Sequence, residues 1–344
     1  MLRDLTSDRS LEEPSTNAAG QEHRALYAIP AVPYLRLRCT LCAQEEALLP
    51  SFKGSMLRGA FGRALRRSVC VMGPQQPCAA CGLRAACHYT RLFETFIEGE
   101  PPPFLKGQTA APRPFVFEAE DERRHFAPGD PLRFDLLLFG SAVGLQTLAA
   151  VAVTRMAEHG LGERRRRFTA EEISFQDASG GFRPLFSAGR PSLEGPAPPL
   201  LPPRNGLPEG EIVLCFRTPA RLKAGGHLLR TLGFRGLVFR MLARTLELAH
   251  FFGRETIDWE IQPFLRQAEG VRVVEQDLAW RDLKRYSARQ GTEMSMGGFV
   301  GSLRLAGDLA PFATLLRTAE IVHIGKGTTF GLGRVEITGC GGEN

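Results

Sequence analysis

Long apolar runs are missing from this sequence of 344 residues. No stretch approaches the ~18 consecutive apolar residues of a membrane-spanning helix, so the sequence predicts no membrane span. The first residues, Met1–Gly20, are polar and lack the apolar core of a secretion signal, and we expect residues 1–24 to form a disordered tail. These absences predict a cytoplasmic protein, in which the eight cysteines are reduced or bound to metal.

An excess of acidic residues is also missing. The chain has 43 Lys and Arg against 37 Asp and Glu, a formal net charge of +6 and a pI of about 9.0. This balance favours an anionic partner. Arginine dominates the basic residues, and its guanidinium group both pairs with phosphate and stacks on bases. The length is sufficient for two domains of ordinary size.

A glycine-rich loop near the C-terminus, residues 325–333, is predicted to join two strands, Ile321–Ile324 and Arg334–Ile337. Its four glycines allow tight bends and close approach to a ligand, and its N–H groups, hydroxyls and one ammonium suit a phosphate. It is not a Walker loop, because Gly327 follows Lys326, and it is not a Rossmann turn, because no helix follows. The loop therefore predicts a site for a phosphate backbone. The alternative is a glycine-rich hairpin without a ligand.

Four blocks of the sequence share one resemblance. The segment His323–Gly333 resembles the C-terminal motif of the CRISPR-associated RAMP endoribonucleases, which process precursor CRISPR RNA. The blocks Gly297–Gly301, Gly307–Phe312 and Lys53–Gly62 match the same family. Because the blocks come in the family's order and span roughly residues 30–338, they are more specific than the loop alone.

This resemblance implies an activity and its chemistry. Members of the family cut CRISPR repeat RNA without a catalytic metal, by attack of a 2′-hydroxyl that leaves a 2′,3′-cyclic phosphate. The resemblance also implies two tandem domains with RNA bound between them. Two alternatives stay open: a RAMP subunit that only binds CRISPR RNA in an effector complex, and a zinc-stabilised adaptor that binds protein.

The order of predicted elements indicates an α+β fold with two ferredoxin-like (RRM-like) domains in tandem. We expect them at residues 25–188 and 209–340, joined by a linker rich in proline and glycine at residues 189–208. The C-terminal half fits the order strand–helix–strand–strand–helix–strand. In the N-terminal half a cysteine-rich insert, residues 70–87, follows the first predicted helix, Gly54–Val69.

Two groups of arginines have two interpretations each. The first predicted strand, Ala31–Thr40, alternates between an apolar face and a basic face with Arg36 and Arg38. That basic face is either solvated or a platform for RNA. The run Arg164–Arg167 is likewise either a solvated turn or an RNA contact.

Four cysteines lie within eighteen residues, with the spacing C-x7-C-x2-C-x5-C. A C-x2-C pair places two thiolates on one tight turn, as tetrahedral zinc requires, and two further cysteines complete a closed site. The spacing therefore predicts structural zinc, bound by Cys70, Cys78, Cys81 and Cys87. An iron–sulfur cluster is the alternative metal centre. Free buried cysteines are the alternative without metal.

The cyclic-phosphate chemistry that the resemblance implies needs an acid, a base and a cation. Better-known relatives carry a histidine in or near the first helix, but Gly54–Val69 contains none. We therefore expect His323, beside the loop, to transfer the proton; the alternative is a histidine that braces the loop through hydrogen bonds. Lys326 and Lys53 are the expected cations. The residues expected to contact RNA are Gly325, Lys326, Gly327, Thr328, Thr329, Arg334, Arg58 and Arg36.

Overall fold

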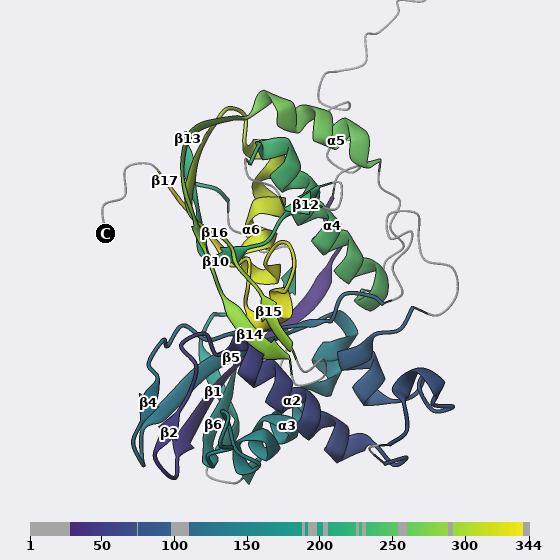
Figure 1. Cartoon of the computed structure of the whole chain (residues 1–344). Helices are drawn as coiled ribbons and strands as arrows, with labels where there is room; N and C mark the ends of the chain where they lie inside the picture. Colours follow the sequence, from purple (N-terminus) through teal and green to yellow (C-terminus); the bar gives the residue numbers. More distant parts are fainter. Residues whose placement is uncertain are drawn as a thin grey trace, which may run out of the picture.

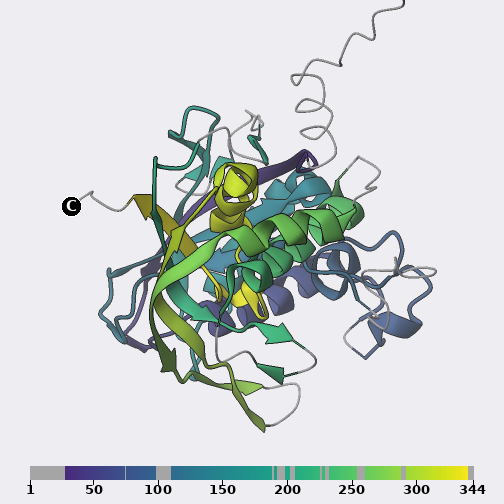
Figure 2. The same ribbon diagram turned by 90° about the horizontal axis from the view of Figure 1, so that it is seen from above.

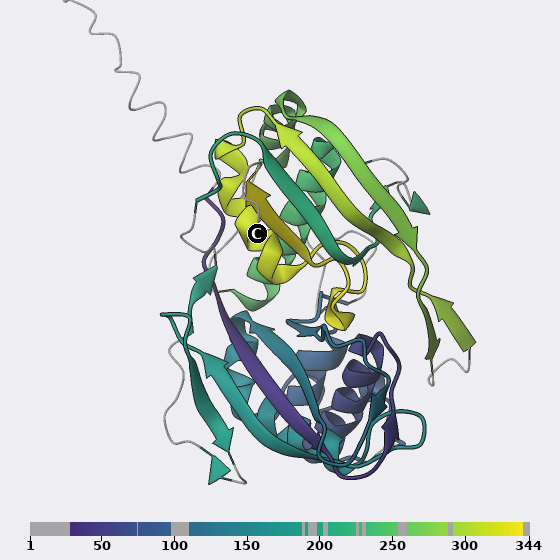
Figure 3. The same ribbon diagram turned by 90° about the vertical axis from the view of Figure 1, so that its left-hand side faces the viewer.

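The computed structural model of this chain describes residues 28–73, 75–97, 110–187, 190–191, 198–201, 206–224, 227–228, 232–253, 260–287 and 292–339. They form a mixed α/β fold with two halves, one above the other in Figure 1 and Figure 3. In each half the helices cover one face of a sheet. Seen from above, the C-terminal half lies over the N-terminal half (Figure 2). The predicted tail, residues 1–24, lies outside the described residues.

The N-terminal half contains a large antiparallel sheet and two long helices. Its elements are β1 (Val32–Ala43), β2 (Ala47–Leu48), α2 (Gly54–Val69), β3 (Phe115–Glu118), β4 (His125–Phe126), β5 (Pro131–Phe139), α3 (Gln146–Glu158), β6 (Phe168–Gln176), β7 (Phe182–Ser187), β8 (Arg190–Pro191) and β9 (Leu200–Leu201). The strand order is β3–β5–β1–β6–β7–β8, with β9 also paired to β1. Helices α2 and α3 share one apolar core with this sheet.

Strand β1 shows why the sheet forms where the sequence predicts it. Leu35, Leu37 and Cys39 are fully buried, whereas Arg38, on the other face of the strand, is exposed. Successive side chains of a strand point to opposite faces, so this alternation places the apolar ones against the helices. The prediction of a half-buried first strand is confirmed.

The C-terminal half repeats this arrangement. Its elements are β10 (Ile212–Ala220), β11 (Lys223–Ala224), β12 (His227–Leu228), α4 (Phe234–Phe252), α5 (Ile261–Gln267), β13 (Arg272–Arg281), β14 (Lys284–Ser287), β15 (Thr292–Ser295), β16 (Gly298–Ala306), α6 (Ala313–Val322) and β17 (Val335–Gly339). The main sheet has the order β13–β16–β10–β17. Numbered along the chain, the four main strands of both halves lie in the order 2-3-1-4, with helices after strands 1 and 3. This is the order of elements that the sequence predicts for the C-terminal half.

The segment Ile321–Ile324, predicted as a strand, is instead the end of helix α6 and the turn after it. Leu315, Ala319 and Val322 recur at helical spacing and are buried. This apolar stripe packs on the core of the C-terminal half and extends the helix into the predicted strand, so the prediction of a strand at Ile321–Ile324 is wrong. His323 ends the helix with a left-handed φ of 60°.

Two other boundaries differ from the sequence prediction. The strand predicted at Asp277–Ser287 begins earlier, at Arg272 in β13, and is interrupted before β14. Residues 189–208, predicted as a linker, contain the short strands β8 and β9, which extend the first sheet.

The two halves meet in a small apolar cluster and at the glycine-rich loop. Val32 and Val116 of the first half pack with Leu248 and Val322 of the second. The short turn η7 (Thr328–Phe330) within the loop contacts both α2 and β3 (Figure 3). The loop therefore lies at the junction of the two halves.

Candidate functional site

The backbone of the glycine-rich loop needs its glycines. Gly325, Gly327, Gly331 and Gly333 all have positive φ, between 71° and 84°, which residues with a Cβ rarely adopt. A Cβ added to Gly333 would lie 1.9 Å from the carbonyl oxygen of Ile324. The predicted role of the glycines in tight bends is thus confirmed.

The loop packs directly on the first turn of α2. A Cβ on Gly54 would lie 1.8 Å from the carbonyl oxygen of Phe330, so the helix and the loop touch through backbone. Beside this contact, the half-buried Arg58 guanidinium lies 4.5 Å from the ring of Phe93 and 4.9 Å from that of Phe330. Arg58, a predicted RNA contact, is thereby placed at the edge of the loop.

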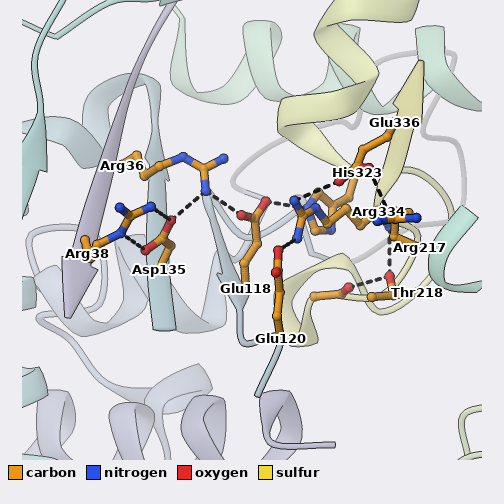
Figure 4. Close-up of polar contacts among 11 residues, drawn as sticks. Arg36, Arg38, Glu118, Glu120, Asp135, Arg217, Thr218, His323, Arg334 and Glu336 are labelled. Carbon is orange, nitrogen blue, oxygen red and sulfur yellow. Dashed lines mark hydrogen bonds and ion pairs between the residues drawn. The ribbon is translucent and has the colours of Figure 1, made fainter. Parts of the chain in front are cut away.

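His323 is completely buried below the loop. Its Nδ1 donates to the carbonyl of Leu332 at 3.2 Å, and its Nε2 lies 2.8 Å from the carboxylate of Glu118 at the end of β3 (Figure 4). Both ring nitrogens are therefore engaged by protein. This is the bracing arrangement given above as the alternative to catalysis. A direct proton transfer to RNA would require His323 to leave Glu118.

Glu118 connects His323 to a chain of charges across the sheet. Arg36 pairs with both Glu118 and Asp135, and Arg38 pairs with Asp135 (Figure 4). Burial alone would raise the pKa of Glu118, but the hydrogen bond from His323 and the charges of His323 and Arg36 hold that pKa well below its usual range. Glu118 is therefore a buried carboxylate that ties β3 to the loop.

Two predicted RNA contacts are already paired with carboxylates. Arg36 makes the two ion pairs just described, and Arg334 pairs with Glu120 and with Glu336 (Figure 4). A guanidinium that is balanced in this way gains less from a phosphate than an unpaired one. Their role in RNA binding stays a prediction.

The two predicted cations differ in accessibility. Lys53 is fully buried, and its ammonium donates to the backbone carbonyls of Asp121 and Arg123. Burial lowers the pKa of Lys53. Lys326 is exposed, and its ammonium makes no hydrogen bond or ion pair within the part of the chain that the structure describes. Of the residues predicted to act in catalysis, Lys326 is the one that presents a charge to solvent.

The threonines of the loop are less accessible than the sequence suggests. Thr328 is 6% exposed and Thr329 is 8% exposed, in the turn that packs on α2 and β3. The exposed part of the loop is centred on Lys326, between Gly325 and Gly327, which are half-buried. A ligand bound to this surface would therefore contact the first residues of the loop, around Lys326.

Residues 214–335 match the family model described as CRISPR-associated endoribonuclease Cas6. A second model, described as an N-terminal domain, matches residues 32–198. The match over residues 214–335 supports a CRISPR-associated protein of the RAMP type. The matched Cas6 segment contains the whole glycine-rich loop and the blocks Gly297–Gly301 and Gly307–Phe312, so the resemblance of these three C-terminal blocks is confirmed. The block Lys53–Gly62 lies in the segment that the second model matches.

Solved Cas6 structures share this fold. The product complex of a Thermus thermophilus Cas6 is 14% identical, with a TM-score of 0.50 over 89% of this chain and 99% of that chain. A partial Cas6-RT-Cas1–Cas2 complex is 15% identical, with a TM-score of 0.52 over 89% of this chain. This chain spans about half the length of that relative (46%). It spans 29% of the length of the matched chain in a second Cas6-RT-Cas1–Cas2 complex. No curated protein matches the sequence.

The four cysteines of the insert do not form a metal site in this arrangement. Within the described residues, no group of three or more His, Cys, Asp or Glu side chains is placed to hold a metal ion. Cys78 and Cys87 pack against the N-terminal core, and Cys70 and Cys81 are also free thiols. All four thiols are half-buried and none forms a disulfide. The four-cysteine knot is not seen, and the bound metal stays a prediction.

Two features at the junction were missed by sequence reasoning. The sequence offers one indication of Glu118: it is the single charged residue at the end of the apolar segment Phe115–Glu118. The second feature is a cavity of about 420 Å³ between the insert and the end of α4, with Arg91 and His250 among its lining residues. Nothing in the sequence indicates this cavity. These two residues are far apart in the sequence, so their proximity follows from the packing of the halves.

Proposed function

We propose that this protein is an endoribonuclease that cuts CRISPR repeat RNA in the precursor transcript to give mature guide RNA. It would use two tandem ferredoxin-like domains and hold the RNA backbone at the glycine-rich loop between them. One observation carries the proposal: Lys326 is exposed and unpaired among the described residues, on a loop of left-handed glycines inside the segment that matches the Cas6 family.

The proposed chemistry is attack of the 2′-hydroxyl on the adjacent phosphate, which gives a 2′,3′-cyclic phosphate and a 5′-hydroxyl. The negative charge that develops on the phosphate is stabilised by the Lys326 ammonium, and Arg58 lies beside the same loop. His323 holds the loop in place through Leu332. The reaction as written has an internal nucleophile, so it does not require a metal-bound water.

The alternative, a RAMP subunit that binds CRISPR RNA without cutting it, has one observation in its favour. His323 and Lys53, two of the three residues expected to act on the phosphate, are fully buried. In that case the effector complex would be the partner of the RNA-bound protein. The adaptor alternative is the least supported, because the matched family is an endoribonuclease family.

An end-labelled repeat RNA separates these functions. We expect cutting at one position in the presence of EDTA, with a cyclic phosphate on the upstream product. A matched RNA with a 2′-deoxy nucleotide just before the cut should bind equally and stay intact, because its nucleophile is missing. Binding without cutting would favour the subunit, and no binding would favour the adaptor.

A further inference from the structure

Three arginines converge on the outer surface of the helices of the N-terminal half. Arg63 and Arg67 lie one turn apart on α2, and Arg165 lies in the turn between α3 and β6. Together with His159 at the end of α3 they line one small concavity. Figure 1 shows α2 and α3 side by side in the lower half of the molecule, where α2 runs from the junction with the C-terminal half toward the lower end.

No carboxylate balances these three charges. In the part of the chain that the structure describes, the side chains of Arg63, Arg67 and Arg165 make no hydrogen bond and no ion pair. Burial lowers the pKa of Arg63, and the positive charges of Arg165 and Arg67 lower it further. Like charges held this close repel, so an anion placed between them is stabilised.

The turn before β6 holds Arg165 in this position. Leu161 and Arg166 exchange two backbone hydrogen bonds, of 2.8 and 2.9 Å, and the Arg166 guanidinium donates to Glu45 at 2.8 Å. Glu45 thus neutralises Arg166, whereas the neighbouring Arg165 lies beside Arg63 and Arg67 of α2. Arg165 has a left-handed φ of 50°, a conformation that costs energy for a residue with a Cβ and that often marks a functional position.

We propose that Arg63, Arg67 and Arg165 form a second phosphate-binding site, which holds the RNA backbone at a distance from the glycine-rich loop. Guanidinium groups bind phosphate oxygens through forked hydrogen bonds. A helix rises by about 1.5 Å per residue, so Arg67 lies ~20 Å along α2 from Gly54, which touches the loop. A ligand that reaches both sites is a polymer of phosphates. The inference rests on the proposed function, which supplies RNA as that polymer.

The test measures binding of labelled repeat RNA to the full chain over a series of salt concentrations. The variants are the double change Arg63→Ala with Arg67→Ala, and Arg165→Gly, which should fold because glycine adopts positive φ freely. We expect roughly tenfold weaker binding by the double variant and a salt slope reduced by about 1.5, since each lost phosphate contact retains its counterions. Arg155→Ala on α3 is the matched control; it should bind as wild type does, because Glu158 already balances Arg155 at 3.1 Å.

Each failure has its own pattern. A double variant that binds RNA with the affinity and salt slope of the control overturns the second site and leaves the proposed function intact. If the double variant binds weakly while the wild type binds RNA and does not cut it, the proposed catalysis fails and this site stands. Inorganic phosphate tests whether the site binds a free anion and not RNA. If phosphate raises the melting temperature of the wild type more than that of the double variant, while both bind RNA equally, the assignment of RNA to this site is wrong.

Discussion

His323 and Glu118 are separated by 205 positions in the chain and meet at 2.8 Å in the interior. A buried ion pair gains its attraction at the cost of removing two charges from water, so its net contribution to stability is small. Removal of His323 is different, because the buried Glu118 would then keep Arg36 as its partner but lose a hydrogen bond that water cannot replace in the interior. At the scale of single residues, His323 is therefore tied more closely to the stability of the loop than to the phosphate.

The first prediction is that His323→Ala lowers the free energy of unfolding by about 1–3 kcal/mol, because the buried Glu118 would keep Arg36 but lose the hydrogen bond from His323, and the Leu332 carbonyl would lose its donor. Cleavage of repeat RNA should fall together with stability. Urea unfolding and single-turnover cleavage measure the two effects, and His125→Ala, at an exposed position in β4, is the control. A rate that falls by roughly two to four decades at unchanged stability would instead show that His323 transfers the proton.

The second prediction concerns Lys326, whose exposed ammonium makes no hydrogen bond or ion pair among the described residues, although its charge acts on the carboxylate of Glu247. Lys326→Ala should weaken RNA binding and reduce the slope of log affinity against log salt by about 1, because one phosphate contact is lost. Arg235→Ala should leave both quantities unchanged, since Glu269 already pairs with Arg235 at 3.0 Å. Equal affinities and slopes for the two variants would mean that the loop does not hold the backbone.

At the scale of elements, the first turn of α2 and the glycine-rich loop depend on each other. Gly54 lets the helix approach the Phe330 carbonyl, and Gly331 in turn lies against the carbonyl of Phe117, where a Cβ would come within 2.4 Å. Two segments from opposite ends of the chain thus pack backbone to backbone. The position of Lys326 relative to Arg58 is set by this contact.

The third prediction compares two glycines of the same helix. Gly54→Ala should destabilise the protein by about 1–3 kcal/mol and weaken RNA binding, because the added methyl group separates α2 from the loop. Gly59→Ala should be neutral or stabilise the helix by about 0.5–1 kcal/mol, since its Cβ would meet its nearest neighbour, the end of Arg63, at 3.6 Å. Thermal unfolding of both variants checks this. Similar melting temperatures for the two would contradict the close approach at Gly54.

The fourth prediction concerns the cysteine-rich insert, residues 70–87, where the metal site stays a prediction. Burial raises the pKa of Cys78, and the nearby Cys70 and Cys87 are among the groups that act on it, so three of the thiols lie in one neighbourhood. A metal would require the insert to close further. We expect elemental analysis of protein purified without added metal to find about one zinc per chain, and Cys78→Ser with Cys81→Ser to remove it. Iron with visible absorbance would indicate a cluster, and a metal-free protein would show that the cysteines are structural thiols.

At the scale of the whole molecule, the two halves are joined by both apolar and charged contacts. The cluster around Val116 and Leu248 bridges them, and the pair of Glu118 with His323 lies close by in the same junction. Because the junction is buried, separating the halves exposes apolar surface and breaks an ion pair together. We expect the halves to unfold in one transition.

The fifth prediction is a dependence of this stability on pH. The folded-state pKa of Glu118 is lowered, so its contribution is present above its unfolded-state pKa, about 4.3, and is lost as the pH falls toward the folded-state pKa. Below about pH 4.3 the unfolded chain binds a proton at Glu118 that the folded chain does not. Urea unfolding between pH 7 and pH 3 should show a loss in wild type that is smaller in Glu118→Gln. Parallel curves for the two proteins would show that Glu118 is not an ionised partner in the junction.

Much of this protein follows from local pattern. The alternation in β1, the helical stripe of α2 and the glycines at left-handed positions all depend on near neighbours in the chain, and periodicity reports such neighbours directly. The blocks around the loop point to the matched family for a related reason, because a loop of this backbone shape needs glycine at set positions.

The tertiary structure decided which side chains are available. His323, Lys53 and Arg334 look like candidate ligands for a phosphate in the sequence. Packing buries the first two and pairs the third with Glu120, a carboxylate that is distant in the chain. The segment Ile321–Ile324, predicted as a strand, begins inside α6, because the core against which the helix packs is built from the rest of the half. Burial and ion pairing are long-range properties, since both depend on what lies opposite a residue after folding, and spacing along the chain carries no record of that.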